Sequence, residues 1–414
     1  MPMIPVQGPG VLDGLLVIDF TQAIAGPIAT RLLAEMGARV IKIESPRGDL
    51  VRGVQWREDA GWAPMFGHGS AGKESVCVDM RKQQGLDIVE RLLAHADIVV
   101  ENFRPGVMER WGFDPARLVE RGRLPVVCSV SGFGRGTEQS GWSATDPLGQ
   151  AFSGMTFMVG EPGGTPYLAA NGIADTATAM SAAAAILGAV IGRMRDGKGR
   201  YLDLSMADVM LAMDCVTTPV AAAHGDVQWQ ALGHDHPAVC PFGVFRAQDG
   251  FMVIQGMGRG ENSTWGRLCL TIGEPGLLKD LRCETEAARL LNRDLVNGRV
   301  AAWVLGRSRE EAVRLIQNAG GLAGPVHSPG EAVTHDYYRL RGSVLDVARE
   351  ESGLAPVKMI GLPQLAAGLS AAPMRPPMLG ENTDPVLRDL LGVSDMQLSQ
   401  LHSEGVVHTR TQWP

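Results

Sequence analysis

Cysteines are few in this sequence and widely spaced. They form no CxxC motif and stand at Cys77, Cys128, Cys215, Cys240, Cys269 and Cys283. Such spacing indicates reduced thiols in a cytosolic protein and argues against a disulfide framework or a zinc site. The segment 224–237 holds His224, His234 and His236 but no fourth ligand, so we expect no metal.

An excess of positive charge, a long apolar run and a signal pattern are also missing. The formal net charge of -7 argues against non-specific nucleic-acid binding. The apolar run Ala182–Ile191 is too short, and too soon followed by charges, to cross a membrane. The first ten residues show no cationic and apolar signal pattern. We therefore expect a cytoplasmic protein with neither nucleic-acid nor membrane partners.

Between residues 11 and 134, apolar runs of strand length alternate with helical segments. The predicted strands are Leu15–Phe20, Arg39–Glu44, Asp97–Glu101 and Pro125–Ser131. The predicted helices are Ile28–Met36, Gln84–His95 and Pro115–Gly122. This alternation predicts βαβ units and a parallel sheet. No GxGxxG follows the first strand, so the sheet is Rossmann-like in pattern without indicating a nicotinamide cofactor.

Basic residues and glycines gather after the predicted strands, where ligands bind in such sheets. The basic residues in and near these loops are Arg47, Arg52, Lys73, Arg104, Arg110 and Arg135. Together they suit a phosphate-bearing ligand, although each arginine alone would be interpreted as a solvated surface residue. Phe103, beside Arg104, is placed to stack on a purine.

One acidic residue, Asp175, stands among small residues before an Ala-rich helix. We expect that helix from about Thr176 to Met194, followed by a strand at Tyr201–Ser205. A carboxylate in this place is commonly a helix N-cap. The alternative is a nucleophilic carboxylate on a loop, backed by a rigid buried helix. The stretch alone favours the cap.

Four segments carry a resemblance to a known family. They are VIDFTQAIAGPIATRLLAEMGARVIKIESPRGDLVRG (17–53), ADIVVENFRPGVMERWGF (96–113), the Asp175 segment with GKGRYLDLSM (197–206), and PPMLGENTDPVL (376–387). With them the sequence resembles the family III CoA-transferases, which include formyl-CoA transferase and carnitine CoA-transferase. The resemblance implies that Asp175 is the nucleophile. It also implies a group of residues around the CoA: Ile24, Ala25, Lys73, Asn102, Phe103, Arg104 and Arg110.

The resemblance further implies a reaction and an architecture. CoA moves from an acyl-CoA to a small carboxylic acid through an aspartyl mixed anhydride and an aspartyl-CoA thioester. CoA is then a substrate, with no tightly bound cofactor and no metal. The implied fold is α/β, with a Rossmann-like parallel-sheet domain built from both chain ends (1–225 with 327–414) and a smaller α+β domain (226–326). The implied assembly is an interlocked homodimer.

Two other functions stay open. The α-methylacyl-CoA racemases share the fold, but their His position holds Thr145, and their supporting Glu position holds Arg246. Thr cannot supply a general acid or base near neutral pH. Asp146, next to Thr145, is also interpretable as a helix N-cap before Pro147. A non-catalytic CoA-binding protein would keep the basic loops and not need Asp175.

Beyond Asp208 the sequence predicts the remaining elements. They are helices at Ala207–Ala223, Ser263–Ile272, Glu284–Leu305, Arg309–Ala319, Thr383–Leu391 and Asp395–Glu404, and a hairpin at Pro241–Gly256. The glycine-rich segment Gly256–Gly260 alone would be an ordinary connection, but the family resemblance makes it our candidate lid, because a glycine-rich loop covers the active site in some members. Because this lid carries Arg259, and Arg246 could face the substrate, we expect a small polar acceptor acid and succinyl-CoA as the first donor to try.

Overall fold

The computed structural model describes residues 10–54, 62–225, 230–231, 233–348, 356–362 and 375–409. The chain divides into two compact units. Unit 1 comprises Met1–Met155, Leu168–Val227 and His335–Pro414, and unit 2 comprises Thr156–Tyr167 and Gln228–Thr334. The predicted boundary at 225–226 borders residues outside the described ranges. Thr156–Tyr167 belongs to unit 2, whereas the sequence-based division assigned it to the large domain.

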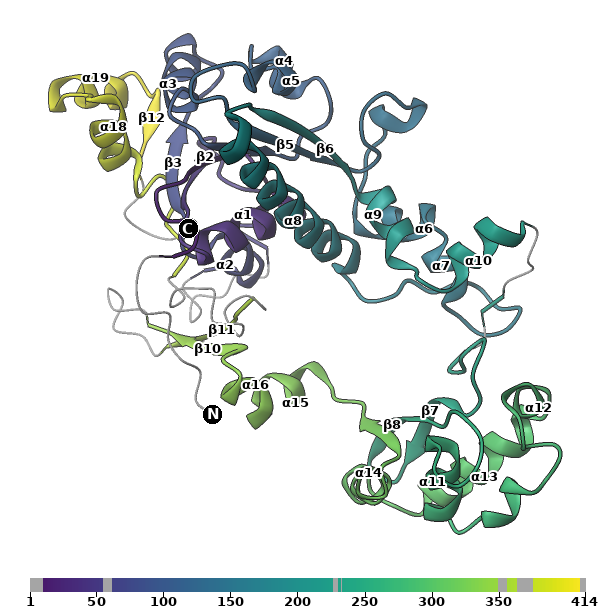
Figure 1. Cartoon of the computed structure of the whole chain (residues 1–414). Coiled ribbons are helices and arrows are strands. Elements are labelled where there is room, and N and C mark those ends of the chain that lie inside the picture. Colours follow the sequence, from purple (N-terminus) through teal and green to yellow (C-terminus); the bar gives the residue numbers. More distant parts are fainter. Residues whose placement is uncertain are drawn as a thin grey trace. The chain divides into compact units, whose positions relative to one another are not determined.

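Seven strands form the central sheet of unit 1 (Figure 1). Their order is β12 (Val407–His408), β3 (Glu74–Val78), β2 (Arg39–Glu44), β1 (Leu16–Asp19), β4 (Ile98–Glu101), β5 (Val126–Ser131) and β6 (Arg200–Ser205). Neighbouring strands run parallel, except that β12 is antiparallel to β3. The strand order reverses at β1, as in doubly wound α/β sheets. The predicted parallel α/β sheet is confirmed, and the C-terminal segment supplies its edge strand.

Helices of unit 1 connect and cover these strands. They are α1 (Ala25–Glu35), α2 (Pro64–Ser70), α3 (Gln83–Leu93), α4 (Val107–Arg110), α5 (Pro115–Leu118), η2 (Glu138–Gly141), α6 (Asp146–Phe152), α8 (Ile173–Asp196), α9 (Met206–Met213), α10 (Thr217–His224), α16 (Asp336–Leu340), α18 (Thr383–Leu391) and α19 (Asp395–Ser403). A hairpin of β10 (Val344–Val347) and β11 (Val357–Ile360) completes the unit. Helix α2 and strand β3 were not predicted from the sequence.

The two faces of the sheet carry separate apolar cores. Val17 and Val40 belong to the core under α1 and α8, which lie side by side (Figure 1). Ile18 and Ile41 belong to the core that includes residues of α3 and α18. Successive side chains of a strand point to opposite faces, so the apolar runs of the sequence are buried on both sides.

The predicted helix Ala207–Ala223 is two helices, α9 and α10. The carboxylate of Asp214 accepts hydrogen bonds from the backbone N–H groups of Val216 (2.9 Å), Thr217 (2.8 Å) and Thr218 (3.2 Å). Asp214 therefore satisfies the first N–H groups of a new helix, which ends the preceding one. Continuous apolar periodicity hid this break in the sequence.

Unit 2 is a three-stranded antiparallel sheet packed with helices. Its elements are α7 (Met155–Met158, whose first residue belongs to unit 1), β7 (Phe242–Ala247), β8 (Gly250–Gln255), α11 (Thr264–Thr271), η3 (Pro275–Leu278), α12 (Glu286–Leu291), α13 (Arg293–Leu305), α14 (Arg309–Asn318), β9 (Leu322–Pro325) and α15 (Pro329–Thr334). The predicted hairpin is confirmed as β7 and β8. The predicted helix Glu284–Leu305 is interrupted at Asn292, whose φ of -118° and ψ of 36° are not helical.

Helix α8 is long and apolar enough to span a membrane by length and composition alone. One side of it, including Ala182, Ile186 and Val190, is buried in the core against the sheet. Burial of this kind is the ordinary reason for an apolar helix in a doubly wound fold.

Candidate active site

The strands β1, β2, β4 and β5 are parallel, so their carboxyl ends lie on the same side of the sheet. Unit 1 has a cavity of about 580 Å³ there. Its described lining comes from all four strand-end loops and includes residues 22–25, 50–51, 102–105 and 130–132. Residues 142–147, Met65, Asp175 and Met206 complete much of the wall. The sequence-based expectation that these loops lie together is correct, and Asp175 lines the same cavity.

Asp175 lies in the first turn of α8, as the third helical residue. The N-cap is Gly172, which adopts a left-handed backbone with φ of 80° and has no side chain to cap the helix. Both sequence-based placements of Asp175 therefore need correction, because it is neither the N-cap nor a loop residue. The helix begins three residues before the predicted start at Thr176.

Asp146, from the start of α6, caps α8 in place of a local side chain. Its Oδ1 accepts hydrogen bonds from the backbone N–H groups of Ala174 (2.6 Å) and Asp175 (3.1 Å), and its Oδ2 accepts one from Gln150 Nε2 (2.6 Å). Asp146 is buried. Asp146 was interpreted from the sequence as the N-cap of α6, but the structure has Thr145 in that position. Asp146 thus fixes the turn that carries Asp175.

The Asp175 carboxyl is partly withdrawn from water. Burial raises its pKa from 3.8 to about 6, and the negative charge of Asp146 adds to the shift. At neutral pH the carboxylate is still mostly ionised, but it is less stabilised than in water. A carboxylate of this kind in a cavity is a suitable nucleophile.

The loop after β1 is joined to the loop after β4 through Asn102. The Asn102 side chain accepts a hydrogen bond from Gln22 N–H and donates one to Gln22 C=O, both at 2.8 Å. These two hydrogen bonds join the loops on either side of the point at which the strand order reverses. Ile24, the residue before α1, and Ala25, its first residue, line the cavity beside this junction.

Phe103 and Arg104 also line the cavity. Phe103 packs edge-to-face on Trp111 at 5.2 Å between ring centroids, which fixes its ring. Arg104 is exposed and donates a hydrogen bond to Ser143 Oγ. Arg110, the last residue of α4, is exposed and is not among the described residues that line the cavity.

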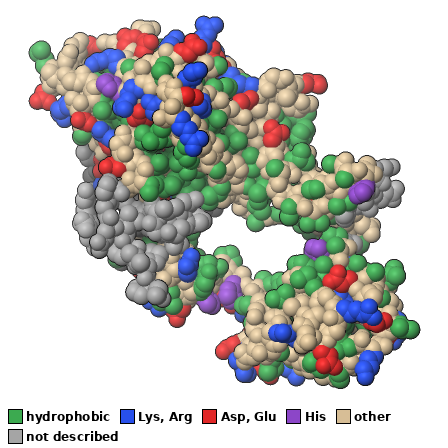
Figure 2. Space-filling view, viewed as in Figure 1, with side chains coloured by type: hydrophobic (Ala, Val, Ile, Leu, Met, Phe, Trp, Pro, Cys, Tyr) green, Lys and Arg blue, Asp and Glu red, His purple; other side chains and the backbone are tan. Residues whose placement is uncertain are grey.

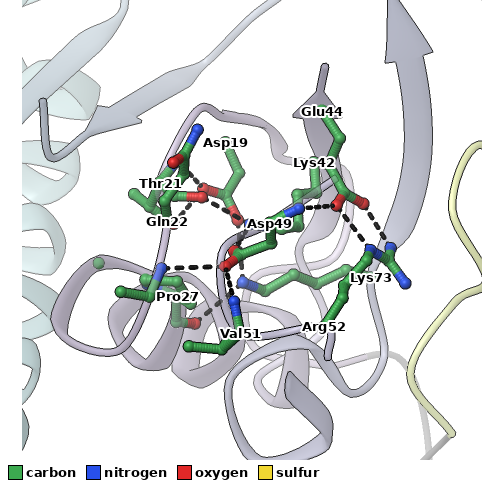
Figure 3. Close-up of polar contacts among 12 residues, drawn as sticks. Asp19, Thr21, Gln22, Pro27, Lys42, Glu44, Asp49, Val51, Arg52 and Lys73 are labelled. Atoms are coloured by element: carbon green, nitrogen blue, oxygen red, sulfur yellow. Dashed lines mark hydrogen bonds and ion pairs between the residues drawn. The ribbon is translucent and has the colours of Figure 1, made fainter. Parts of the chain in front are cut away.

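Lys73 is buried and is also not among the described residues that line the cavity. Its ammonium contacts Asp19 Oδ2 (2.9 Å), Thr30 Oγ1 (2.7 Å) and Pro27 C=O (2.9 Å) (Figure 3). Burial lowers the Lys73 pKa to about 8, although Asp19 opposes the shift. The structure therefore gives Lys73 internal partners, and its predicted contact with CoA stays a prediction.

Two other basic residues predicted near the strand-end loops, Arg52 and Arg135, also have carboxylate partners. Arg52 is buried and binds Glu44 with two nitrogens, at 2.8 Å and 2.5 Å (Figure 3). Arg135 pairs with Glu109. The sequence showed the cations on these loops, but it could not show which carboxylates neutralise them.

The residues predicted to flank the acyl group lie in both units. Thr145 lines the cavity, whereas Arg246 is on β7 of unit 2, with its guanidinium 5.5 Å from the ring centre of Phe251. In the candidate lid, Arg259 pairs with Glu284. Among the described residues, no group of three or more His, Cys, Asp or Glu side chains could hold a metal ion.

Sequence reasoning missed the residues that support the cavity from below. Asp19 and Asp49 are buried, and their carboxylates accept backbone N–H groups of the loop after β1. A signal was available, because a charged residue that ends an apolar strand in a buried sheet requires a partner. The partner itself depends on which strands are neighbours.

The fold and the cavity together define a doubly wound α/β protein in which Asp175, a carboxylate of raised pKa, lines a cavity formed by strand-end loops. Residues 12–383 match the model of CoA-transferase family III, and the chain belongs to this family.

Relatives of known name are similar over most of the chain. The chain is 31% identical over 364 residues to the succinyl-CoA:mesaconate CoA-transferase of Haloarcula hispanica, covering 84% of this chain and 90% of that protein. It is 28% identical over 404 residues to the succinyl-CoA–D-citramalate CoA-transferase of Chloroflexus aurantiacus, covering 96% and 98%. A CAIB/BAIF family protein from Brucella suis superposes with a TM-score of 0.78 at 27% identity, covering 92% of this chain and all of that one. The chain is therefore an enzyme that transfers CoA.

Proposed function

We propose that this enzyme transfers CoA from succinyl-CoA to a small dicarboxylic acid, with Asp175 as the covalent nucleophile. The observation that carries the proposal is the Asp175 carboxylate, which faces the cavity from a helical turn fixed by Asp146. A fixed backbone limits the positions that the carboxylate can take, and this favours attack on a bound thioester.

The proposed reaction proceeds in two exchanges. An Asp175 oxygen attacks the thioester carbonyl, the carbon–sulfur bond breaks, and a mixed anhydride and CoA thiolate result. The thiolate then attacks the aspartyl carbonyl, and the donor acid leaves as its carboxylate. The acceptor carboxylate attacks the resulting aspartyl-CoA thioester, and the same steps in reverse release the new acyl-CoA and Asp175. No net proton, metal ion or ATP is consumed.

The electrostatic setting of Asp175 supports this order of events. Burial raises its pKa to about 6, so the ionised form dominates at neutral pH but gains little from solvation. Asp175 also lies in the first turn of α8, near the positive end of the helix dipole, and this position supports the proposal that a negatively charged intermediate is tolerated there.

The substrate class rests on the relatives. The two transferases named above pair succinyl-CoA with mesaconate and with D-citramalate, which are both small dicarboxylic acids. The cations first considered for a second carboxylate, Arg246 and Arg259, have partners within unit 2. The choice of acid therefore stays a proposal that a substrate screen decides.

Mass spectrometry of the acylated enzyme tests the nucleophile. After incubation with succinyl-CoA, a CoA adduct should map to the peptide containing Asp175, and Asp175→Ala should abolish it. Transfer by Asp175→Ala should fall by several orders of magnitude. Retention of more than roughly a tenth of the wild-type rate, a barrier change of only about 1.4 kcal/mol, would contradict the mechanism.

The geometry disfavours a racemase of the same fold. The side chain at the expected His position is Thr145, and the neighbouring Asp146 carboxylate already accepts bonds from three donors. Neither group is poised to move a proton at a substrate carbon. Measuring deuterium uptake at the α-carbon of a 2-methylacyl-CoA in heavy water separates the two functions, since only a racemase incorporates it.

We also propose a homodimer, interlocked as in the family resemblance, and a cytoplasmic location. The described part of unit 1 exposes apolar side chains on α8 and α9, including Ile191, Met194, Leu211 and Met213. Figure 2 shows apolar side chains gathered over the part of unit 1 that carries α8. Apolar patches of this kind mark interaction sites. Light scattering should give twice the mass of one chain, and a monomer at micromolar concentration would contradict the assembly.

A further inference from the structure

The loop at residues 21–23 forms part of the cavity wall, and its backbone is held by side chains outside the loop. Thr21 N–H donates to Asp19 Oδ1 (2.8 Å), Lys42 Nζ donates to Thr21 C=O (2.5 Å), the Asn102 amide binds both Gln22 N–H and C=O (2.8 Å each), and Ala23 N–H donates to Asp49 Oδ1 (3.1 Å). A loop whose backbone groups are occupied in this way has little freedom to move before a ligand arrives.

Ala23 shows that this loop is held in an unfavourable conformation. Its φ of 64° lies in the left-handed region, which a residue with a Cβ rarely adopts. Such a conformation persists where the surroundings fix it. At Ala23 the described contact that fixes the N–H is the Asp49 carboxylate.

Asp49 joins two walls of the cavity. Its Oδ1 accepts hydrogen bonds from the N–H groups of Ala23 and Val51, both at 3.1 Å, and both residues line the cavity. Its Oδ2 pairs with Lys42 Nζ at 2.8 Å, with both side chains buried (Figure 3). Because the same ammonium donates to Thr21 C=O, Lys42 and Asp49 together connect the loop after β1 with the loop after β2.

We propose that Asp49 is a positioning residue for CoA binding. Asp49 is not among the described residues that line the cavity, so it acts through the backbone of Ala23 and Val51. Both carboxylate oxygens take part, because Oδ1 accepts the two N–H groups while Oδ2 pairs with Lys42. The inference rests on the proposed function, in which this cavity receives the CoA ester.

Asp49→Asn is the direct test, with Asp97→Asn as a matched control. Asp97 is also buried, accepts Leu16 N–H at 3.0 Å and pairs with Arg193 at 3.2 Å, but it precedes the amino end of β4, whereas the cavity lies at the carboxyl ends of the strands. Asp49→Asn should raise the KM for succinyl-CoA and the calorimetric Kd for CoA about tenfold each, with kcat changed less than about twofold. Asp97→Asn should lower stability and leave both constants at their wild-type values.

The outcomes are distinguishable from failure of the proposed mechanism. If both variants lose stability and bind CoA like the wild type, Asp49 is only structural and the inference is wrong. If the wild type forms no aspartyl-CoA adduct but Asp49→Asn still weakens CoA binding, the inference stands and the mechanism fails. CoA binding is measured without turnover, so the two results are independent.

Hydrogen–deuterium exchange of the wild-type protein covers the case in which Asp49→Asn does not fold. Peptides spanning 20–26 and 49–54 should be protected before CoA is added, and CoA should increase the protection only slightly. Rapid exchange of both peptides in the absence of CoA, with protection appearing on CoA binding, would show a loop that is ordered by its ligand and would overturn the inference.

Discussion

Asp175 should reduce the stability of the folded protein at neutral pH, and Asp175→Asn should restore it. Burial, and then the charge of Asp146, raise the Asp175 pKa in the folded protein to about 6 from its ordinary value of 3.8. Asn has nearly the same shape but no charge to bury. The substitution therefore removes an unfavourable ionisation together with the proposed nucleophile, so we expect stability to rise as activity is lost.

The size of the gain follows from the pKa shift. A shift of roughly two units corresponds to about 3 kcal/mol of free energy at about 1.4 kcal/mol per unit. The carboxylate keeps some access to water, so we discount this value to about 1–2 kcal/mol. The folded state binds the Asp175 proton more tightly than the unfolded chain does. Its stability is thus unaffected below about pH 4 and declines as the pH rises through about 6.

Urea unfolding of both proteins from about pH 4 to about pH 8 measures this difference. Asp175→Asn should exceed the wild type by about 1–2 kcal/mol above pH 6, and the curves should converge near pH 4. Asp208→Asn is the control, because Asp208 occupies the same third position of α9 but is exposed. A stability gain of Asp175→Asn that is equal at all pH values, or one shared by Asp208→Asn, would refute the argument.

The remaining predictions concern kinetics. Asp146→Asn removes the negative charge beside Asp175 and keeps an oxygen for the N–H of Ala174, so the acidic limb of the kcat/KM profile should move to lower pH. An unmoved limb would mean that burial alone sets the Asp175 pKa. Arg104→Ala should raise the KM for succinyl-CoA several-fold and leave that of the acceptor acid nearly unchanged; equal changes in both constants would assign Arg104 a structural role.

Much of the fold was predictable because its signals are local. Helix α18 has the predicted bounds, Thr383–Leu391, since Pro385 fits its first turn and Gly392 ends it at φ of 65°. Strand β2 also has the predicted bounds, Arg39–Glu44. The break between α9 and α10 depends on the direction of the Asp214 side chain, which cannot be predicted from the spacing of apolar residues in the sequence.

The loops that form the cavity were predictable from the sequence, but the contacts between them were not. The strand-end loops could be read because parallel strands end at a common edge. The cap of α8 could not, because Asp146 lies 28 residues before the Ala174 N–H that it binds. The pairs of Lys73 with Asp19 and Arg135 with Glu109 similarly depend on tertiary neighbours, so the basic rim seemed more available to a phosphate than it is.

The buried charges near the cavity stabilise the shape of its loops more than they change its electrostatic potential. Three carboxylates, Asp19, Glu44 and Asp49, face three cations, Lys42, Arg52 and Lys73, so the described cluster has no net charge when all six are ionised. A neutral cluster attracts an anionic ligand weakly from a distance. Its members instead fix the loops after β1 and β2 by hydrogen bonds. Under the proposed function, attraction of the CoA phosphates falls to exposed cations such as Arg104, and the buried charges fix the loops that would receive the thioester.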